Sequence, residues 1–384
     1  KRWPAISKII YSALAISISI LLIGNKIDLP DSQADAASFE RAAWELGQSG
    51  FLNVLNNFTG TGPEFITWLI AIPYSILGRN IIMAKCISLL FGIGVVFLGW
   101  SLAKKIWDEN VANKVGWLIT LYPSLILYSV TILREVYIIF FLLIALHGIF
   151  YWAKNKSFKS IILTSMGFLA ASSFHGAIFI GLLIFFILIG IFYIKKFLYL
   201  ISKFRTKLKD VIIIVIIFLT ITSYFTGKFR VSYLGTFENL IQIDRIFTKT
   251  NVSTRGDASW PEWTKINSIK ELFYKAPIRS FYFLFSPFPW DIKKTSHLIG
   301  MIDSILMMYL TYLVIINLKI ILADPVLKIF FIILVGYIII HGIGVGNFGT
   351  GIRHRTKFVI IFILLAGPKL IKIFNSKKNF IRYP

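Results

Sequence analysis

Ten apolar runs, each about as long as a helix that crosses a bilayer, constrain this chain more than any other feature. A membrane-spanning helix needs about 20 predominantly apolar residues, and the chain is 57% hydrophobic and only 15% charged over its 384 residues. The runs show almost no strand-like alternation, so helices and not a barrel must satisfy their backbone groups. We therefore predict an all-α polytopic membrane protein with a single integral membrane domain over 1–384. The predicted spans lie at 8–24, 82–103, 111–131, 136–153, 160–175, 177–194, 211–227, 297–318, 327–345 and 358–374.

Two further apolar stretches, 63–78 and 278–290, are short, interrupted by proline and rich in aromatic residues. Such stretches suit helices that lie in the membrane interface, and counting them as additional spans is the alternative. With both in the interface, the chain has two large outer loops. The loop 25–81 holds an amphipathic and an interfacial helix, and the loop 228–296 holds the other interfacial segment.

The basic residues indicate the orientation. In this arrangement one side of the membrane carries 22 of the 41 Lys and Arg residues but only four of the 18 acidic residues. Because Lys and Arg in short loops collect on the cytoplasmic side, we place both termini there, with residues 1–24 as a retained first helix. We expect a bacterial inner-membrane protein whose active site faces the periplasm or the exterior.

The net charge of +23 and the single cysteine exclude some functions. The cations lie in short loops between apolar runs, where they set topology and contact anionic headgroups, so we expect membrane lipids and no nucleic acid as partners. Cys86 lies within an apolar run, and one cysteine can form neither a disulfide framework nor a Cys-based metal site within one chain.

The first outer loop contains a predicted amphipathic helix. Asp31 or Ser32 can cap it, and apolar residues recur at three- and four-residue spacing from Ala36 to Leu46. Asp31 and Asp35 are then either a cap and a first-turn acid that complement the helix dipole, or catalytic groups. In the second case Asp35, held near cations and the membrane surface, is a general base for an incoming hydroxyl.

Polar residues also lie at the outer ends of predicted spans in two other places. Arg134 and Glu135 are adjacent where one predicted span ends and the next begins, and they form either an interfacial ion pair or a site in which Arg134 binds a phosphate oxygen or sugar and Glu135 orients it. His175 marks a tight hairpin or helix end in a stretch too long for one span. It is either hydrogen-bonded structure, as we expect for His147, or a ligand.

The most informative stretch is "GIGVGNFGTGIRHRTKF", at 342–358, which we expect to be a glycine-rich outer turn. Its glycines permit a positive φ and close backbone approach, and the guanidinium groups of Arg353 and Arg355 can fork onto phosphate oxygens. The following helix offers its free N–H groups to the same anion. With His354 and Lys357 this turn describes an anion cradle, and cations that contact lipid headgroups are the alternative.

The loop 228–277 adds Trp260 and Trp263 beside Asp257 and Glu262. Aromatic rings next to polar groups suit the C–H faces of sugars, and Trp also anchors in membrane interfaces. The two interpretations remain open at this point.

The order of these segments carries a resemblance. "DAASFERAAWELGQSG", then "GPEFITWLIAIPYSILGRNIIMAKCISLLFGI", a basic loop, and "LITLYPSLILYSVTILREVYIIFFLLIAL" resemble the N-terminal half of the GT-C superfamily of membrane glycosyltransferases. "LREVY…SSFHGAIF" and "GIRHRTKF" are similar to segments of O-antigen and exopolysaccharide polymerases. The resemblance covers roughly 30–180 and 347–370. The chain departs from the family in having no clear Asp-x-Asp and no large soluble C-terminal domain.

The resemblance implies a substrate and a set of roles. The donor would be a sugar or oligosaccharide on polyprenyl phosphate or diphosphate, and the acceptor a hydroxyl of a glycan, lipid or protein. Asp35 matches the catalytic acid of the first outer loop and Glu135 the site in the second, while Arg134, Arg353 and Arg355 would hold phosphate. No external nucleotide would be required, because the lipid phosphate is the leaving group, and a divalent metal stays open as a cofactor. A transporter or flippase of a lipid-linked oligosaccharide or small anion is the alternative function.

Overall fold

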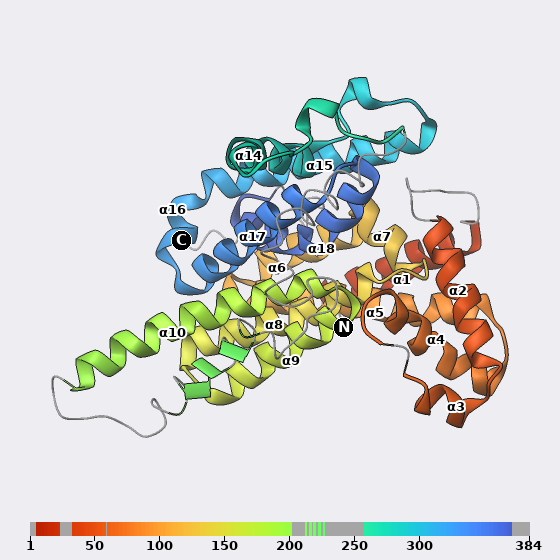
Figure 1. Cartoon of the computed structure of the whole chain (residues 1–384), viewed down its shortest axis with the longest axis horizontal. Helices are drawn as coiled ribbons and strands as arrows, with labels where there is room; N and C mark the ends of the chain where they lie inside the picture. The colour runs from red at the N-terminus through yellow and green to blue at the C-terminus, as the bar shows by residue number, and fades with distance from the viewer. Residues whose placement is uncertain are drawn as a thin grey trace, which may run out of the picture.

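The structure is a computed structural model that describes residues 5–23, 33–58, 60–201 and 257–370 and eight positions between 212 and 226. Over these residues every named element is a helix, so the predicted all-α fold class is confirmed (Figure 1). The α-helices are α1 (Ala5–Ile23), α2 (Gln33–Gly47), α3 (Phe51–Asn56), α4 (Pro63–Leu77), α5 (Ile81–Ile106), α6 (Glu109–Leu121), α7 (Pro123–Ser129), α8 (Glu135–Asn155), α9 (Phe158–Phe174), α10 (Phe179–Ile201), α14 (Ile269–Phe285), α15 (Thr295–Ile316), α16 (Leu318–Ala323), α17 (Pro325–Gly344) and α18 (Phe348–Ala366). The 3-10 helices are η2 (Gly176–Ile178), η3 (Glu262–Thr264), η4 (Pro289–Asp291) and η5 (Gly367–Lys369).

Six helical segments among the described residues are long and apolar enough to cross a membrane, and each coincides with a predicted span. The chain is therefore an integral membrane protein. The predicted span 160–175 corresponds to α9, an apolar helix of 17 residues. Most of the predicted span 211–227 lies outside the described residues. The six segments are Ala5–Leu22, Ile81–Ile106, Glu135–Asn155, Gly176–Tyr199, His297–Ile316 and Pro325–Gly344.

Two predicted spans have different bounds in the structure. The run 111–131 is not one helix, because α6 ends at Leu121 and α7 begins at Pro123. Proline has no backbone N–H to donate and its ring clashes with the preceding turn, so it starts a helix more easily than it continues one. The run 358–374 belongs to α18, which begins earlier, at Phe348.

The helix α18 lies at the centre of the bundle. It packs against α15 and α17 on one side and α8 on the other (Figure 1). Its apolar residues are buried all round the helix from Phe358 to Ala366, as expected when neighbours cover every face of an apolar helix. The residues just before this run, which include the four cations of the sequence motif, are therefore held at the end of a central, fully packed element.

The helices α2, α3 and α4 form a separate lobe beside the bundle (Figure 1). The predicted amphipathic helix is α2, and it packs along α4. Glu40 of α2 joins them, because its carboxylate accepts from the Tyr74 hydroxyl at 3.0 Å and pairs with Arg79 at 2.7 Å. The lobe reaches the bundle where the backbone N–H of Gly62 donates to Ser173 O at 2.6 Å, next to the end of α9.

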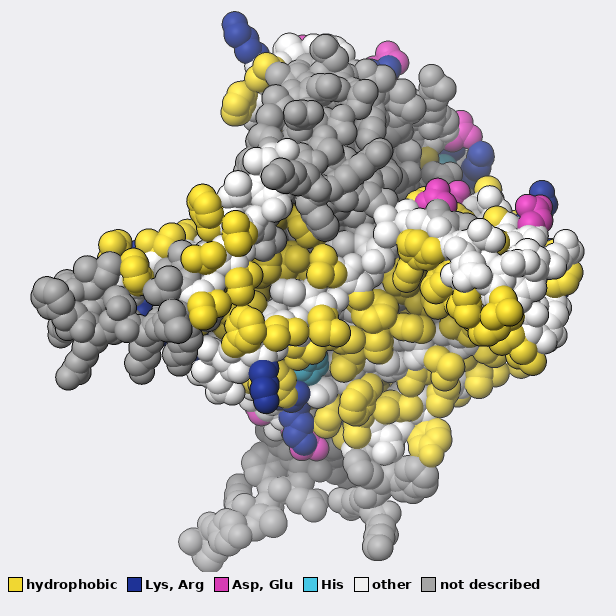
Figure 2. Space-filling view, turned by 60° about the horizontal axis from the view of Figure 1, so that its bottom comes forward, with side chains coloured by type: hydrophobic (Ala, Val, Ile, Leu, Met, Phe, Trp, Pro, Cys, Tyr) yellow, Lys and Arg dark blue, Asp and Glu magenta, His cyan; other side chains and the backbone are white. Residues whose placement is uncertain are grey.

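Much of the protein surface that faces its surroundings is apolar. Figure 2 shows hydrophobic side chains spread in a broad band, with charged side chains mainly near its margins. Helices α3 to α5 carry exposed apolar side chains, among them Leu52, Leu77 and Ile82. Large contiguous apolar surfaces mark contact with lipid or protein, and α4 covers the predicted interfacial stretch 63–78. The other stretch, 278–290, forms the end of α14 and the residues after it.

Candidate functional site

The cations of the "GIRHRTK" motif lie in a helix. The helix α17 ends at Gly344 and α18 begins at Phe348, so only three residues separate the two helices. Asn347 is the N-cap that starts α18 at this point, because its side chain accepts from the Thr350 N–H at 2.7 Å. The predicted glycine-rich outer turn is therefore limited to residues 345–347, and the part of it from Phe348 onward, which holds all four basic residues, is helical.

The glycines of the motif have a different role from the one expected. None of those between 342 and 351 has a positive φ. Gly342 instead permits close packing of α14 on α17, because a Cβ there would lie 2.7 Å from Ser280 Cα and 2.9 Å from Ser280 N. A Cβ added at Gly344 would instead meet no atom within 4 Å. The glycines therefore supply no positive-φ turn for an anion, and the anion-binding hypothesis depends on the side chains and on the N-terminus of α18.

Helical geometry separates the four cationic positions into two groups. Successive residues of an α-helix point about 100° apart, so residues three and four apart share a side. Arg353, His354 and Lys357 accordingly lie on one side of α18, and Lys357 Nζ donates to His354 Nδ1 at 2.8 Å. Arg355 points to the other side.

Two carboxylates from distant parts of the chain meet Arg353. Glu135 is the first residue of α8, and its Oε1 accepts from Arg353 Nε at 3.2 Å. Asp35 is in the first turn of α2, and its Oδ2 pairs with Arg353 Nη1. Lys357 Nζ lies 3.8 Å from the same oxygen of Glu135. We call these four residues, Asp35, Glu135, Arg353 and Lys357, the acid–base cluster.

The members of the acid–base cluster differ in how far they reach solvent. The side chains of Glu135 and Lys357 are each 1% exposed and that of Arg353 is 10% exposed, while that of Asp35 is 48% exposed. Two buried cations beside a buried carboxylate compensate part of each other's desolvation, which an isolated charge could not do. Asp35 is thus the more solvent-accessible carboxylate of the two, and Glu135 pairs with Arg353 in the interior.

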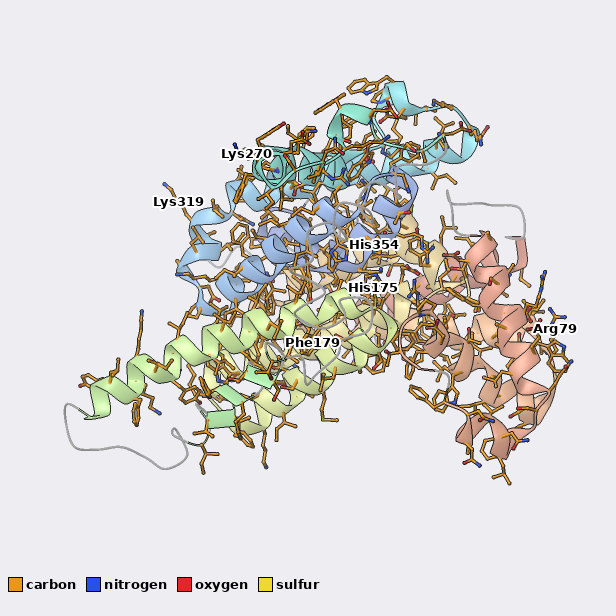
Figure 3. The ribbon with its side chains drawn as sticks, viewed as in Figure 1. Arg79, His175, Phe179, Lys270, Lys319 and His354 are labelled. Carbon is orange, nitrogen blue, oxygen red and sulfur yellow. The ribbon has the colours of Figure 1, made fainter. Side chains whose placement is uncertain are left out.

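Arg134 and His175 join the end of α9 to this cluster. Arg134 Nη1 donates to Phe174 O at 3.1 Å, and His175 is the residue after α9. Both therefore lie where α8 and α18 begin and α9 and α17 end. Figure 3 shows His175 and His354 side by side near the middle of the protein, and Arg79 of the lobe far from them.

A third histidine, which the sequence interpretation missed, lies with His175 and His354. His341 is in the last turn of α17, and its ring centre is 5.9 Å from that of His175 and 5.1 Å from that of His354. The sequence did carry a signal, because His341 falls near the predicted outer end of the span 327–345. We call these three residues the histidine cluster.

Arg355 is fully occupied by the protein. Its Nε donates to Asp303 Oδ2 at 2.9 Å, Nη1 donates to Leu284 O and Ser286 O, and Nη2 donates to Ser304 Oγ at 2.8 Å. The side chains of Arg355 and Asp303 are each 1% exposed. This side chain fixes α18 to α14 and α15, so the phosphate-binding role predicted for Arg355 does not fit its surroundings. The sequence signal for this pair was Asp303, a lone acid within a predicted span.

The two tryptophans of the outer loop are placed differently from each other. Trp260 is buried, its Nε1 donates to Ser286 Oγ at 3.0 Å, and the Arg279 guanidinium lies 5.3 Å from its ring. These contacts are structural. Trp263 is 56% exposed and packs its edge against Tyr282.

The end of the same loop does reach the acid–base cluster's helix. The Trp260 N–H donates to Gly346 O at 2.9 Å and the Phe348 N–H to Ala258 O at 2.9 Å, so the segment pairs with the residues that precede α18. Asp257 forms an ion pair with Lys294 at 2.8 Å. The remaining candidate, Asp31, lies outside the described residues, as does the whole of 228–256.

Comparisons with known proteins provide little guidance. No protein-family model matches the sequence, and no curated protein matches it. Among solved structures the chain is similar to the crystal structure of ArnT from Cupriavidus metallidurans in the apo state, with a TM-score of 0.34 and 10% sequence identity over 93% of this chain and 76% of that one. A likeness at this TM-score carries no argument, so the GT-C resemblance stays a prediction from the sequence.

Proposed function

We propose that the protein is a membrane glycosyltransferase that transfers a sugar or oligosaccharide from a polyprenyl-phosphate or polyprenyl-diphosphate donor to an acceptor hydroxyl. The observation that carries the proposal is the meeting of Asp35, Arg353 and Glu135, which come from three distant parts of the sequence. An exposed carboxylate beside a buried, anchored guanidinium supplies both a proton acceptor and a phosphate ligand. The sequence resemblance to GT-C enzymes points to the same reaction.

The position of the cluster suits a donor that is itself in the membrane. The acid–base cluster lies at one end of the bundle, where helices of spanning length begin and end. The basic segments predicted to be cytoplasmic, such as 154–159, join the opposite ends of α8 and α9. We therefore place the cluster at the outer face, where it can meet the phosphate of a lipid while the acyl or prenyl chain stays in the bilayer.

The chemistry follows from the charges. The acceptor oxygen attacks the anomeric carbon, the bond from that carbon to the phosphate oxygen breaks, and the lipid phosphate leaves with the electron pair. Asp35 takes the proton of the hydroxyl, a role that contributes about 10²–10⁴-fold to a rate. The negative charge on the leaving phosphate grows as the bond breaks, and preorganised cations stabilise that charge in the transition state.

Arg353 is the group best placed to bind this phosphate. Its Nε and Nη1 already donate to Glu135 and Asp35, and among the described residues no acceptor contacts its Nη2. A phosphate oxygen can bind there without breaking the pair with Glu135. Lys357 and Arg134 add positive charge nearby, and Trp263 offers an exposed ring for a sugar.

The test uses purified full-length protein in detergent with a lipid-linked sugar and a soluble acceptor. Asp35→Asn keeps the shape of the side chain and removes the proton acceptor, so we expect transfer to fall about 10²–10⁴-fold. Arg353→Lys keeps the charge but loses the planar fork, and we expect it to lower the rate with less effect than Arg353→Ala. Glu45→Gln, an exposed acid on the same helix α2, is the matched control and should leave the rate unchanged.

The products of this assay also separate transfer from transport. A transferase releases free polyprenyl phosphate or diphosphate, whereas a transporter or flippase leaves the sugar–phosphate bond intact. Normal transfer by Asp35→Asn and Arg353→Ala, in protein that elutes as the parent does, would refute the assignment of these residues. Intact donor with every variant and with the parent protein would refute the proposed reaction.

A further inference from the structure

The histidine cluster consists of three imidazoles from three separate segments of the chain. His175 follows α9, His341 is in the last turn of α17 and His354 is in the second turn of α18, and a nitrogen of each lies within 4.8 Å of a nitrogen of the others. His175 and His341 are buried, and His354 is partly buried. Ionisable side chains at membrane depth are costly to bury and usually mark a function. The chain has only five histidines, so the gathering of three uses most of them.

The hydrogen bonds of His341 fix its tautomer. Its Nδ1 lies 3.0 Å from Tyr337 O, and because a carbonyl oxygen can only accept, Nδ1 carries the proton. The neutral ring therefore has a lone pair on Nε2. That atom is buried, and among the described residues no hydrogen-bond partner contacts it. Metal-binding histidines characteristically donate their other N–H to a backbone carbonyl or carboxylate, which sets the same tautomer.

Lys357 connects the histidine cluster to the acid–base cluster. Its ammonium group donates to His354 Nδ1 at 2.8 Å and lies 3.8 Å from Glu135 Oε1. While this contact holds, His354 Nδ1 is an acceptor and cannot bind a metal ion. A small rotation of the Lys357 side chain toward Glu135 frees His354, and the buried carboxylate then compensates the ammonium charge.

We propose that His175, His341 and His354 bind a divalent transition-metal ion of the Zn²⁺ class. Three neutral imidazoles are borderline-soft ligands that suit Zn²⁺ or Co²⁺, and a set of three leaves a coordination position open for water or another ligand. Lys357 competes with the ion for His354, so the two cations exclude each other from that ring. This inference concerns a site outside Asp35 and Arg353 and does not depend on the proposed transfer reaction.

The experiment measures metal binding by full-length protein purified in detergent with a non-histidine affinity tag. After chelator treatment, Co²⁺ is titrated and its visible absorption followed, because tetrahedral Co²⁺ absorbs much more strongly than the hydrated ion. We expect one saturable site per chain, and displacement by Zn²⁺ should abolish the absorption. A titration with no saturable band and no Zn²⁺ competition would overturn the proposal, whatever the behaviour of the variants.

Variants locate the site. His341→Gln and His354→Gln should each weaken Co²⁺ binding at least tenfold, whereas His297→Gln, a buried histidine whose Nδ1 accepts from the Lys293 N–H, should not change it. Lys357→Met should strengthen binding, because the competing cation is gone. Equal weakening by the control, or weaker binding by Lys357→Met in protein that elutes as the parent does, would contradict this assignment of ligands.

Discussion

The contrasting roles of Arg353 and Arg355 lead to a prediction about stability. The Arg355 side chain donates to one carboxylate, one hydroxyl and backbone carbonyls, all in the interior. Arg355→Met removes every one of these donors and leaves the Asp303 carboxylate, 1% exposed, without its cation. Breaking a buried ion pair by removing one partner costs about 3–5 kcal/mol, most of it because the other charge stays buried. We expect the free energy of unfolding to fall by that amount.

A double-mutant cycle isolates the pair. Asp303→Leu alone should also destabilise the protein, because Arg355 then keeps a buried charge with only neutral acceptors. The double variant Arg355→Met/Asp303→Leu leaves no buried charge at this pair, so it should be more stable than either single variant by roughly 1–3 kcal/mol.

The measurement is denaturant unfolding of the detergent-solubilised protein, followed by tryptophan fluorescence. Arg353→Lys is the matched comparison on the same helix, and it should unfold close to the parent because the ammonium group can still pair with Glu135. A loss below about 1 kcal/mol for Arg355→Met, or a double variant no more stable than the two single ones, would refute the inference that this arginine is structural.

Two further predictions concern packing and pH. Gly342→Ala places a methyl group against the Ser280 backbone and should cost about 1–3 kcal/mol of unfolding free energy, whereas Gly344→Ala, with open space, should not; equal effects would contradict the packing argument. The hydrogen bond from Arg79 holds the pKa of Glu40 below its usual 4.5, against the opposing effect of burial. A lowered pKa stabilises the folded state above pH 4.5, and this contribution is lost as the pH falls through the lowered pKa. Limited proteolysis of the α2–α4 lobe between pH 6 and pH 3 should show this loss in the parent but less of it in Arg79→Gln.

Much of the fold could be predicted because apolar length is a strong local signal. Six predicted spans are helices of spanning length, and the spacing from Ala36 to Leu46 correctly predicted α2. The predicted topology put the segments of Asp35 and Arg353 on one side of the membrane, and in the structure these two side chains form an ion pair. The run 111–131 is not one helix, because a hydropathy average is insensitive to Pro123 whereas an α-helix is not easily continued through a proline.

The errors at the site have a common physical cause. Glycine has a poor intrinsic helix propensity, so Gly349 and Gly351 indicated a turn, but the Asn347 cap and burial in the bundle outweigh it. Because the segment is helical, the side chains of Arg353 and Arg355 point to opposite sides of α18. Amino-acid composition alone could not predict this difference. The carboxylate facing each arginine depends on how α18 packs, which is a tertiary property.

The helical state of the motif also determines which changes in sequence it tolerates. Loops accept insertions and deletions readily, since they can absorb a residue without moving their ends. Removing one residue between Asn347 and Arg353 would instead rotate every later side chain of α18 by about 100°. Arg353 would turn away from Glu135 and Arg355 away from Asp303 together. A chain of this kind can therefore diversify its neighbouring loops in length, while the distance from the cap to the arginines stays fixed.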